Sequence, residues 1–397
     1  MMKDFMKKTI LITISVLIFL ALFFVIFKFY EHSVSLNKSI NLAIEYMENN
    51  TLDNGRFVYR TNVYPWISFF GKGKKYNCTR HAGVLYAMYL CERYLKNYSL
   101  KEKRYLASEY LIKNYIKEIS PDMYAVISNP KEENLQVSEA KLGSTGLALC
   151  SLSNLYPEGK IDLKILQGLG DFIIYMQKSD GSFYSKYIVP EKLKSDKFVS
   201  LYYPGEAALG LLFLNEVDPD KKWTTAAQKA LLYLANFRKD PRYKGNFDHW
   251  ALIATKKLFE TPNNGLNDDE KQLLQTSVEN MTYAVLDKQV TDKNSPYRGS
   301  FVDNIQLGSI ATIMEGLTAA YYVTNDRKLK AEIKKALKLG TGFLSRYQVK
   351  EGTLKGGIPA NAYWNSPDRI IAKIIRIDNV QHALSAWILY KQIGWFK

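Results

Sequence analysis

Two kinds of helix alternate along this chain, and their alternation is the feature that most limits its fold. Apolar residues recur with the helical period over most of the sequence, whereas alternating apolar–polar strand runs are scarce. One kind of helix is amphipathic and Lys-rich, and we expect it at about residues 35–50, 101–118, 160–177, 222–238, 268–288 and 327–347. The other kind is apolar nearly all round and rich in Ala and Gly, and we expect it at about residues 80–96, 139–155, 204–217, 248–259, 305–323 and 379–392. Helices that are apolar on all sides are buried, so the second kind predicts an inner layer.

Strict alternation of outer and inner helices makes six helical hairpins. A single hairpin cannot bury its apolar face, so the hairpins stack on one another. The simplest closed arrangement is an all-α fold, the (α/α)6 toroid, in which an outer ring of helices surrounds an inner ring. All inner helices would then run in one direction and bring their N-termini to the same end. Helix N-termini present free N–H groups and the positive end of the helix dipole, so we expect ligands to bind there.

An apolar run precedes the helical hairpins. Residues 9–27 carry no charge and are about long enough to cross a bilayer core as a helix. Lys3, Lys7 and Lys8 come before this run, so the positive-inside rule places the N-terminus in the cytoplasm. We interpret residues 1–29 as a cytoplasmic stub and an uncleaved transmembrane signal anchor in the cell membrane. Residues 30–397 would form a single toroid domain in the periplasm or outside the cell. A cleaved signal peptide is the alternative.

The chain is basic, with 54 Lys and Arg against 39 Asp and Glu and a formal charge of +15. This excess reflects either a Lys-rich proteome or affinity for an anionic partner, such as an acidic glycan or phospholipid headgroups. We expect no nucleic-acid partner, because no dense basic run interleaved with aromatic residues is present. The three cysteines, Cys78, Cys91 and Cys150, have no CxxC spacing and are too few for a disulfide framework. We expect Cys91 and Cys150 to be small buried apolar residues on helices, and a single disulfide is the alternative.

Histidines and carboxylates fall at the expected starts of inner helices. His81, His249 and His382 all lie there; three imidazoles could bind zinc, but no HxxxH or HxH pair exists, so we expect neither a metal nor a cofactor. Glycosidic bond cleavage needs a protonated acid and an ionised carboxylate or base. We expect Glu206 and Asp248 to be this acid/base pair and His249 to be the third catalytic residue. Helix capping or pairing with the helix dipole is the alternative for both carboxylates.

Other polar and aromatic residues at the same end are expected to bind the substrate. Tyr and Trp rings offer flat faces to sugars, and Arg and His side chains suit an acidic sugar. The expected substrate-binding residues are Arg80, His81, Tyr202, Tyr203, Trp250, Glu315, Asp378 and His382. For Asp378 the pattern with Gln381 also fits a helix-capping box. Arg80, His81, Tyr202, His249 and Arg376 would equally suit β-elimination on a uronate polymer.

One short motif resembles a known toroid repeat. In the segment Phe172–Phe183 (FIIYMQKSDGSF), Gln177, Gly181 and Phe183 match the Gln, Gly and aromatic residue that end an outer helix in prenyltransferases and squalene cyclases. Weaker echoes occur at residues 53–57 and 348–354. The chain lacks the DxDD acid motif of the cyclases and the zinc ligands of the protein prenyltransferases. The barrel as a whole also resembles the six-hairpin glycosidase and epimerase superfamily.

These observations predict a membrane-anchored extracytoplasmic enzyme that acts on cell-envelope or capsular polysaccharide. Its partner would be a neutral or acidic poly- or oligosaccharide, and its chemistry would be that of a glycoside hydrolase with carboxylate acid/base catalysis. A uronate lyase or an epimerase is the alternative enzyme. A non-catalytic glycan-binding or scaffold subunit of the machinery for polysaccharide synthesis or export is the alternative of another class.

Overall fold

A computed structural model describes residues 13–15, 18–19, 35–62, 76–240, 246–301, 305–362 and 374–394. The predicted membrane anchor at residues 9–27 lies almost entirely outside these ranges. Among the helices within them, none has the length and apolar character needed to cross a membrane.

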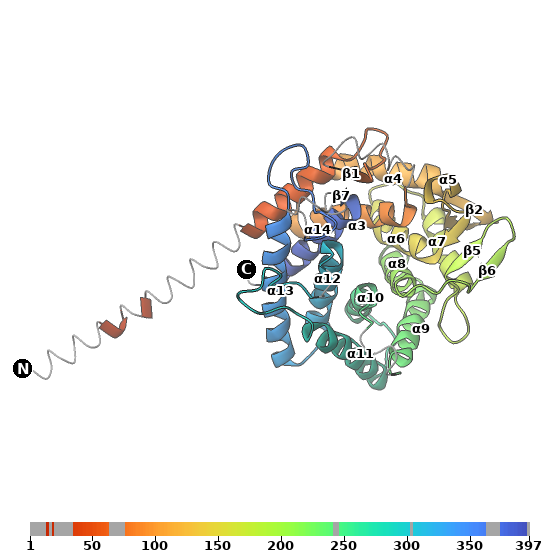
Figure 1. Cartoon of the computed structure of the whole chain (residues 1–397). Helices are drawn as coiled ribbons and strands as arrows, with labels where there is room; N and C mark the ends of the chain where they lie inside the picture. The colour runs from red at the N-terminus through yellow and green to blue at the C-terminus, as the bar shows by residue number, and fades with distance from the viewer. Residues whose placement is uncertain are drawn as a thin grey trace, which may run out of the picture.

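The inner helices form a closed ring (Figure 1). Each contacts the next one in chain order, and the last contacts the first. They are α3 (Cys78–Leu95), α6 (Leu142–Leu152), α8 (Tyr203–Val217), α10 (His249–Glu260), α12 (Leu307–Val323) and α14 (Ile377–Gln392). Most of their residues are buried on every side, as the sequence pattern predicts.

The outer helices pack around this ring. They are the helix at residues 35–49, α4 (Lys101–Tyr115), α7 (Leu163–Met176), α9 (Lys221–Phe237), α11 (Asp268–Leu286) and α13 (Arg327–Tyr347). Each buries only one face. In α13, for example, Leu329, Ile333, Ala336 and Leu337 are buried while the Lys residues between them face outward. The alternation of outer and inner helices therefore gives the toroid that the sequence predicts.

Glycines let the inner helices approach one another closely. A Cβ added to Gly210 of α8 would lie 2.4 Å from the carbonyl oxygen of Gly146 in α6. A Cβ added to Gly205 would lie 2.5 Å from the backbone nitrogen of Ala251 in α10. Real Cβ atoms do not come so close, so only glycine allows this spacing of α6, α8 and α10.

The Gln–Gly motif after α7 connects neighbouring outer helices. The side chain of Gln177 donates to the carbonyl oxygen of Ala226 in α9 at 2.9 Å. Gly181 has a φ of +92°, and a Cβ there would lie 2.5 Å from the carbonyl oxygen of Lys229 in the same helix. Both residues of the motif therefore join α7 to the next outer helix.

A second pair of glutamine and glycine residues closes the outer ring. Gln348, after α13, donates to the carbonyl oxygen of Ser39 at 2.9 Å. The glycine that accompanies it is Gly356, whose added Cβ would lie 1.8 Å from the carbonyl oxygen of Leu42. The predicted echo at residues 348–354 is therefore correct for the glutamine, but its glycine lies just beyond the predicted segment.

The toroid also contains short β-strands, so the fold is mostly helical rather than all-α. The strands are β1 (Arg60–Asn62), β2 (Ile116–Ser120), β3 (Met123–Val126), β4 (Glu139–Lys141), β5 (Lys186–Ile188), β6 (Leu193–Ser195) and β7 (Ile374–Arg376). They form the antiparallel pairs β1–β7 and β2–β3 and the sheet β4–β5–β6. Residues 139–141, predicted as the start of an inner helix, form β4 instead, because β5 offers them backbone partners. The short helix α5 (Pro130–Glu133) and the 3-10 helix η2 (Ser153–Leu155) complete the described elements.

Cys91 and Cys150 are buried, as predicted, and Cys78 is buried as well; all three are free thiols. Burial raises the pKa of Cys78 and of Cys91 to about 12. Because the thiolate is the nucleophilic form, neither thiol is activated for attack at neutral pH.

Candidate active site

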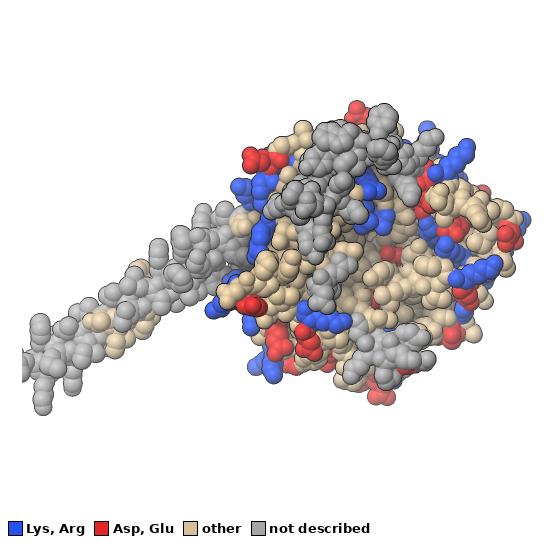
Figure 2. Space-filling view, viewed as in Figure 1, with Lys and Arg blue, Asp and Glu red and all other residues tan. Residues whose placement is uncertain are grey.

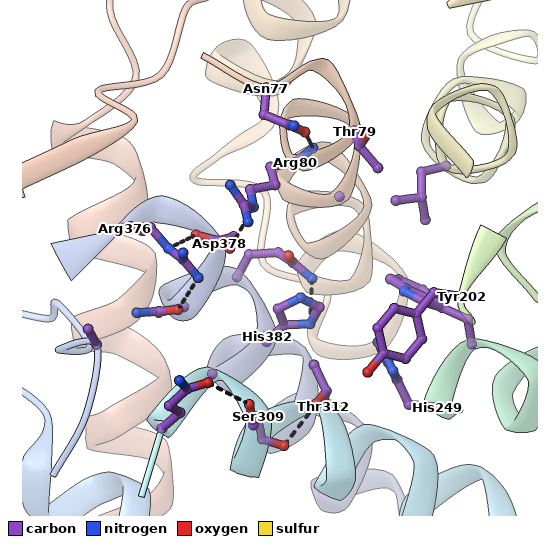
Figure 3. A pocket seen from close by; sticks show the side chains of 18 of the residues that line it. Asn77, Thr79, Arg80, Tyr202, His249, Ser309, Thr312, Arg376, Asp378 and His382 are labelled. Atoms are coloured by element: carbon purple, nitrogen blue, oxygen red, sulfur yellow. Dashed lines mark hydrogen bonds and ion pairs between the residues drawn. The ribbon is translucent and has the colours of Figure 1, made fainter. Parts of the chain in front are cut away.

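A pocket of about 580 Å³ opens at the end of the ring where the inner helices begin. Residues at the starts of α3, α8, α10, α12 and α14 line it, together with residues of β1 and β7. Figure 3 shows side chains from these elements converging on the cavity. A cavity therefore lies at the end of the ring where the sequence predicts the ligand site.

Most of the predicted site residues meet in this pocket. Arg80, Tyr202, Tyr203, Glu206, His249, Trp250, Asp378 and His382 line it. Three predicted residues, His81, Asp248 and Glu315, are not among the lining residues and are buried behind the wall.

His81 connects its own helix, α3, to the outer helix α4 rather than facing the cavity. Its Nε2 lies 2.8 Å from the carbonyl oxygen of Ala107 in α4, and its Nδ1 lies 2.6 Å from the hydroxyl of Tyr76. The ring is 1% exposed, and burial lowers its pKa to about 4. His81 is therefore a neutral, fully hydrogen-bonded core residue, and its predicted contact with substrate does not fit this position.

Asp248 is the N-cap of α10. Its Oδ1 accepts from the backbone N–H of Ala251 at 3.1 Å, and its Oδ2 lies 2.5 Å from a guanidinium nitrogen of Arg238. The carboxylate is 0% exposed. Burial raises its pKa, and Arg238 and the cap hydrogen bonds oppose that shift. The capping alternative therefore describes its contacts, and both oxygens already have partners.

Asp378, unlike Asp248, does not cap its helix. The N-cap of α14 is Arg376, and no side chain caps the helix there. Asp378 lies in the first turn and bridges two guanidinium groups, with Oδ2 2.9 Å from Nε of Arg80 and Oδ1 3.1 Å from Nε of Arg376. The predicted capping box is wrong because these two arginines take both carboxylate oxygens.

Glu206 lies in the first turn of α8, against α6. The side chain is 5% exposed, and its Oε2 has no hydrogen-bond partner among the described residues. A Cβ on Gly143 would lie 1.8 Å from this oxygen, so the glycine provides the space for the carboxyl group. Burial, and secondarily the charge of Asp248, raises the pKa of Glu206 to about 8. The group is therefore mostly protonated at neutral pH.

Glu315 and His382 form a buried carboxylate–imidazole pair. Oε2 of Glu315 lies 2.8 Å from Nδ1 of His382. Glu315 is 0% exposed, whereas the side chain of His382 is 17% exposed and reaches the pocket. Burial raises the pKa of Glu315, and the neighbouring imidazole opposes that shift. A carboxylate that holds one ring nitrogen fixes the tautomer and orientation of the other nitrogen.

His249 completes this cluster without a close polar partner. Its Nε2 lies 3.9 Å from Oε2 of Glu315 and has no hydrogen-bond partner among the described residues. Its ring lies edge-on to Tyr202, with centroids 5.4 Å apart, and 5.6 Å from the ring of His382. Burial, and then the nearby His382, lowers the pKa of His249 well below its usual value, so the imidazole is neutral.

The same three side chains are the candidate metal ligands of the described chain. One ligand atom from each of His249, Glu315 and His382 lies within 4.8 Å of the others. A shared metal would have to replace the 2.8 Å contact between Glu315 and His382. The same 2.8 Å contact also makes Glu315 and His382 an acid–base pair.

The sequence reasoning missed several polar residues of the pocket. They are Arg60, Asn77, Thr79, Gln306, Ser309, Thr312, Asn361, Asn379 and Gln381. Most of them lie within a few positions of a predicted residue or of a predicted helix start, so extending each predicted start by one turn would have found them. Arg60 is different, because only the pairing of β1 with β7 brings it to the site.

No protein-family model and no curated protein sequence matches the chain, but solved structures do. A cellobiose 2-epimerase from Bacillus thermoamylovorans superimposes with a TM-score of 0.64 and 12% identity, over 90% of this chain and 98% of the epimerase. An inactive variant of an α-1,6-mannanase from Salegentibacter sp., in complex with α-1,6-mannotriose, gives 0.60 and 10% identity, over 91% and 100%. A cellulase of C. cellulolyticum gives 0.58 and 12% identity, over 91% and 99%.

The chain has the (α/α)6 toroid fold of the six-hairpin glycosidases and epimerases. At these identities the likeness concerns the toroid fold alone. The chemistry has to be argued from the side chains of the pocket.

Proposed function

We propose that this toroid is a carbohydrate-active enzyme that moves protons at its sugar substrate. In this proposal His382 is the base, Glu206 is the acid, and Glu315 is the positioning residue for His382. The observation that carries the proposal is the 2.8 Å contact between Glu315 and Nδ1 of His382 at the wall of the pocket. We assign the ring proton of His382 to Nδ1, which then donates to the carboxylate and leaves the lone pair on Nε2 available as a base. The side-chain nitrogen of Gln381 lies 3.2 Å from the same Nδ1 and would be its donor in the opposite tautomer.

The protonated state of Glu206 provides the complementary group. Its raised pKa, about 8, keeps the proton on the carboxyl group at neutral pH, so it can give a proton to the substrate. A reaction in which His382 takes a proton from a sugar carbon and Glu206 supplies one is an epimerisation or an elimination. This is the type of chemistry that we favour for the pocket.

Hydrolysis is the second candidate, and the raised pKa of Glu206 is also what a glycosidase acid needs. The expected partner, Asp248, supports it less well, because that carboxylate is 0% exposed and pairs with Arg238. In a hydrolase, His382 would have to activate water in its place.

One experiment separates the two candidates. The purified protein is incubated with a panel of oligosaccharides in D2O, and the products are followed by NMR. We expect either solvent deuterium at a ring carbon, because a proton removed by His382 exchanges with the solvent before it returns in an epimerisation, or a new carbon–carbon double bond, which an elimination leaves in the product. New reducing ends with neither carbon-bound deuterium nor a double bond would show hydrolysis and reject the favoured reaction. Unchanged sugars across the panel would leave a glycan-binding subunit as the better description.

We also propose that residues 9–27 anchor the toroid on the outer side of the cell membrane, where cell-envelope or capsular polysaccharide would be its substrate. The support is the uncharged run and the three lysines before it. Protease treatment of intact and of lysed spheroplasts, from which any outer membrane has been opened, tests this orientation. A toroid domain that is degraded only after the spheroplasts are lysed would contradict it.

A further inference from the structure

We propose that the substrate carries a uronic acid, and that its carboxylate binds between Arg80 and Arg376 on one wall of the pocket. The proposal rests on the proposed function for the reaction, but the binding itself depends only on this wall.

Asp378 holds the two guanidinium groups beside one another. It contacts each of them through Nε, at 2.9 Å for Arg80 and 3.1 Å for Arg376. Because these two bonds use only Nε, the Nη1 and Nη2 atoms of both arginines can bind other partners. Arg80 uses its Nη1 on the hydroxyl of Tyr59, and Arg376 directs Nη2 to Asn379. Their side chains remain 38% and 40% exposed, so a ligand can reach them.

A third arginine stands next to this pair. Arg60 in β1 lies directly opposite Arg376 in β7, and both line the pocket. Like charges opposite each other on paired strands destabilise a sheet. An anion bound at the pocket wall would offset this repulsion, which gives the fold a functional reason to keep the pair.

The charges of the pocket favour an anion. Among the lining residues that the structure describes, three guanidinium groups, Arg60, Arg80 and Arg376, face one carboxylate, Asp378. The other acid of this described lining, Glu206, is mostly protonated at neutral pH, and His249 is neutral. Figure 2 shows Lys and Arg side chains beside the hollow in the middle of this face. A surplus of positive charge in a hollow attracts anionic ligands.

The arrangement around His382 explains why the anion would be a sugar carboxylate. In Figure 3, Arg80, Asp378 and Arg376 lie on one side of His382, and Tyr202 and His249 lie on the other. Tyr202 is 41% exposed and offers a face to a sugar ring. A uronate ring stacked there, with its carboxylate toward the arginines, would bring the carbon next to that carboxylate to His382. Guanidinium groups on the carboxylate make this carbon more acidic, because they stabilise the charge that develops when its proton leaves.

Binding of matched ligands tests the proposal. Isothermal titration calorimetry compares a uronic acid oligosaccharide with its carboxyl-reduced, neutral counterpart of the same length. We expect the wild-type protein to bind the uronate at least about tenfold more tightly, since hydrogen bonds to charged groups are the strong ones. The preference should shrink as salt is added. Equal affinity for the two ligands would overturn the proposal. So would a preference for a sulfated neutral oligosaccharide over the uronate.

Two variants locate the effect. Arg376→Met should remove about tenfold of the preference, and Arg376→Lys should retain part of it, because Lys keeps the charge but not the planar fork. Arg327→Met is the matched control, since it removes one exposed arginine at the start of α13. Thermal melting confirms that each variant is folded. An unchanged preference in folded Arg376→Met would reject the site.

The failure of this proposal differs from the failure of the proposed function. Uronate binding that depends on Arg376, with neither deuterium at carbon nor a new carbon–carbon double bond, would keep the binding site and reject the reaction. Deuterium exchange on a neutral sugar, without uronate binding, would do the reverse.

Discussion

Glu315 and His382 meet across the inner ring, with Oε2 of the glutamate 2.8 Å from Nδ1 of the histidine and 67 positions between them in the chain. The carboxylate comes from the middle of α12, where apolar residues surround it. A buried acid is costly without a partner, and the imidazole provides that partner. The pair therefore accounts for the acid within an apolar helix and gives His382 a fixed orientation at the pocket.

Replacing Glu315 by Gln should separate positioning from binding. The amide retains a hydrogen-bond acceptor but not the charge, so we expect kcat to fall about 10-fold to 100-fold with KM nearly unchanged. His382→Gln removes the base and should cost more, about 10²-fold to 10⁴-fold in kcat. Steady-state kinetics and the 15N shifts of the His382 ring in Glu315→Gln check this. Glu109→Gln, on the exposed face of α4, is the control. A KM effect alone would argue against a role in proton transfer.

The raised pKa of Glu206 predicts an alkaline limit to activity. If the protonated group is the acid, kcat falls as the pH rises through about 8, where the proton is lost. Glu206→Gln should be less active by about 10²-fold or more and should not show this alkaline limb. A pH–rate profile of both proteins checks the prediction, and the same limb in the variant would assign it to another group.

The same residue predicts a pH dependence of stability. Folding raises the pKa of Glu206 from its ordinary value of 4.5 to about 8, so the folded state keeps a proton that the unfolded state releases between these values. This contribution to stability is complete below about pH 4.5 and is lost as the pH rises through 8. We expect Glu206→Gln to melt with a smaller decline between pH 5 and 8 than the wild-type protein. Parallel declines would contradict the buried, protonated state.

Asp248→Asn should destabilise the toroid without removing its chemistry. Asn is still a good N-cap, but the variant leaves Arg238, whose side chain is 6% exposed, without its ionic partner. Breaking such a pair costs about 3–5 kcal/mol. We expect a lower melting temperature and nearly normal kcat per folded molecule. The double variant Asp248→Asn, Arg238→Met should recover part of the stability. A large loss of kcat at full stability would instead restore Asp248 to the acid/base pair.

Gly143→Ala tests how the acid is accommodated. The added Cβ would lie 1.8 Å from Oε2 of Glu206 and 2.5 Å from a ring carbon of Tyr203, so one of these side chains must move. We expect a loss of about 1–3 kcal/mol and a clear fall in kcat. Gly342→Ala is the control, because its Cβ meets nothing within 4 Å on the exposed side of α13 and should stabilise that helix slightly. Equal stability and activity in both variants would show that Glu206 has free space.

The helical ring could be predicted from the sequence because every hairpin has the same burial requirements. An inner helix must be apolar on all sides and an outer helix on one, so each pattern is visible within its own segment. The common direction of the inner helices then brings Arg80, Glu206, His249 and His382 to one end without any long-range information. These parts of the prediction are confirmed by the positions of the side chains in the pocket.

The sequence could not distinguish residues whose local patterns are alike. Asp248 and Asp378 both lie at the start of an inner helix, but one caps it and the other bridges two arginines. Their roles depend on Arg238 and Arg80, which belong to other elements of the fold. The contact of Glu315 with His382 is equally non-local. Distances of this kind follow from packing and not from spacing along the chain.

The pairing of β1 with β7 has a consequence for how the protein matures. Arg60 faces Arg376, and Arg80 shares Asp378 with Arg376, so one pocket wall combines residues from opposite ends of the toroid sequence. Contacts between residues so distant in the chain form late and slowly in folding. A toroid that lacks its last hairpin would have most of its core and the buried acid, but no base and no complete arginine wall. In the proposed mechanism, catalytic competence would therefore arise only once the final inner helix is in place.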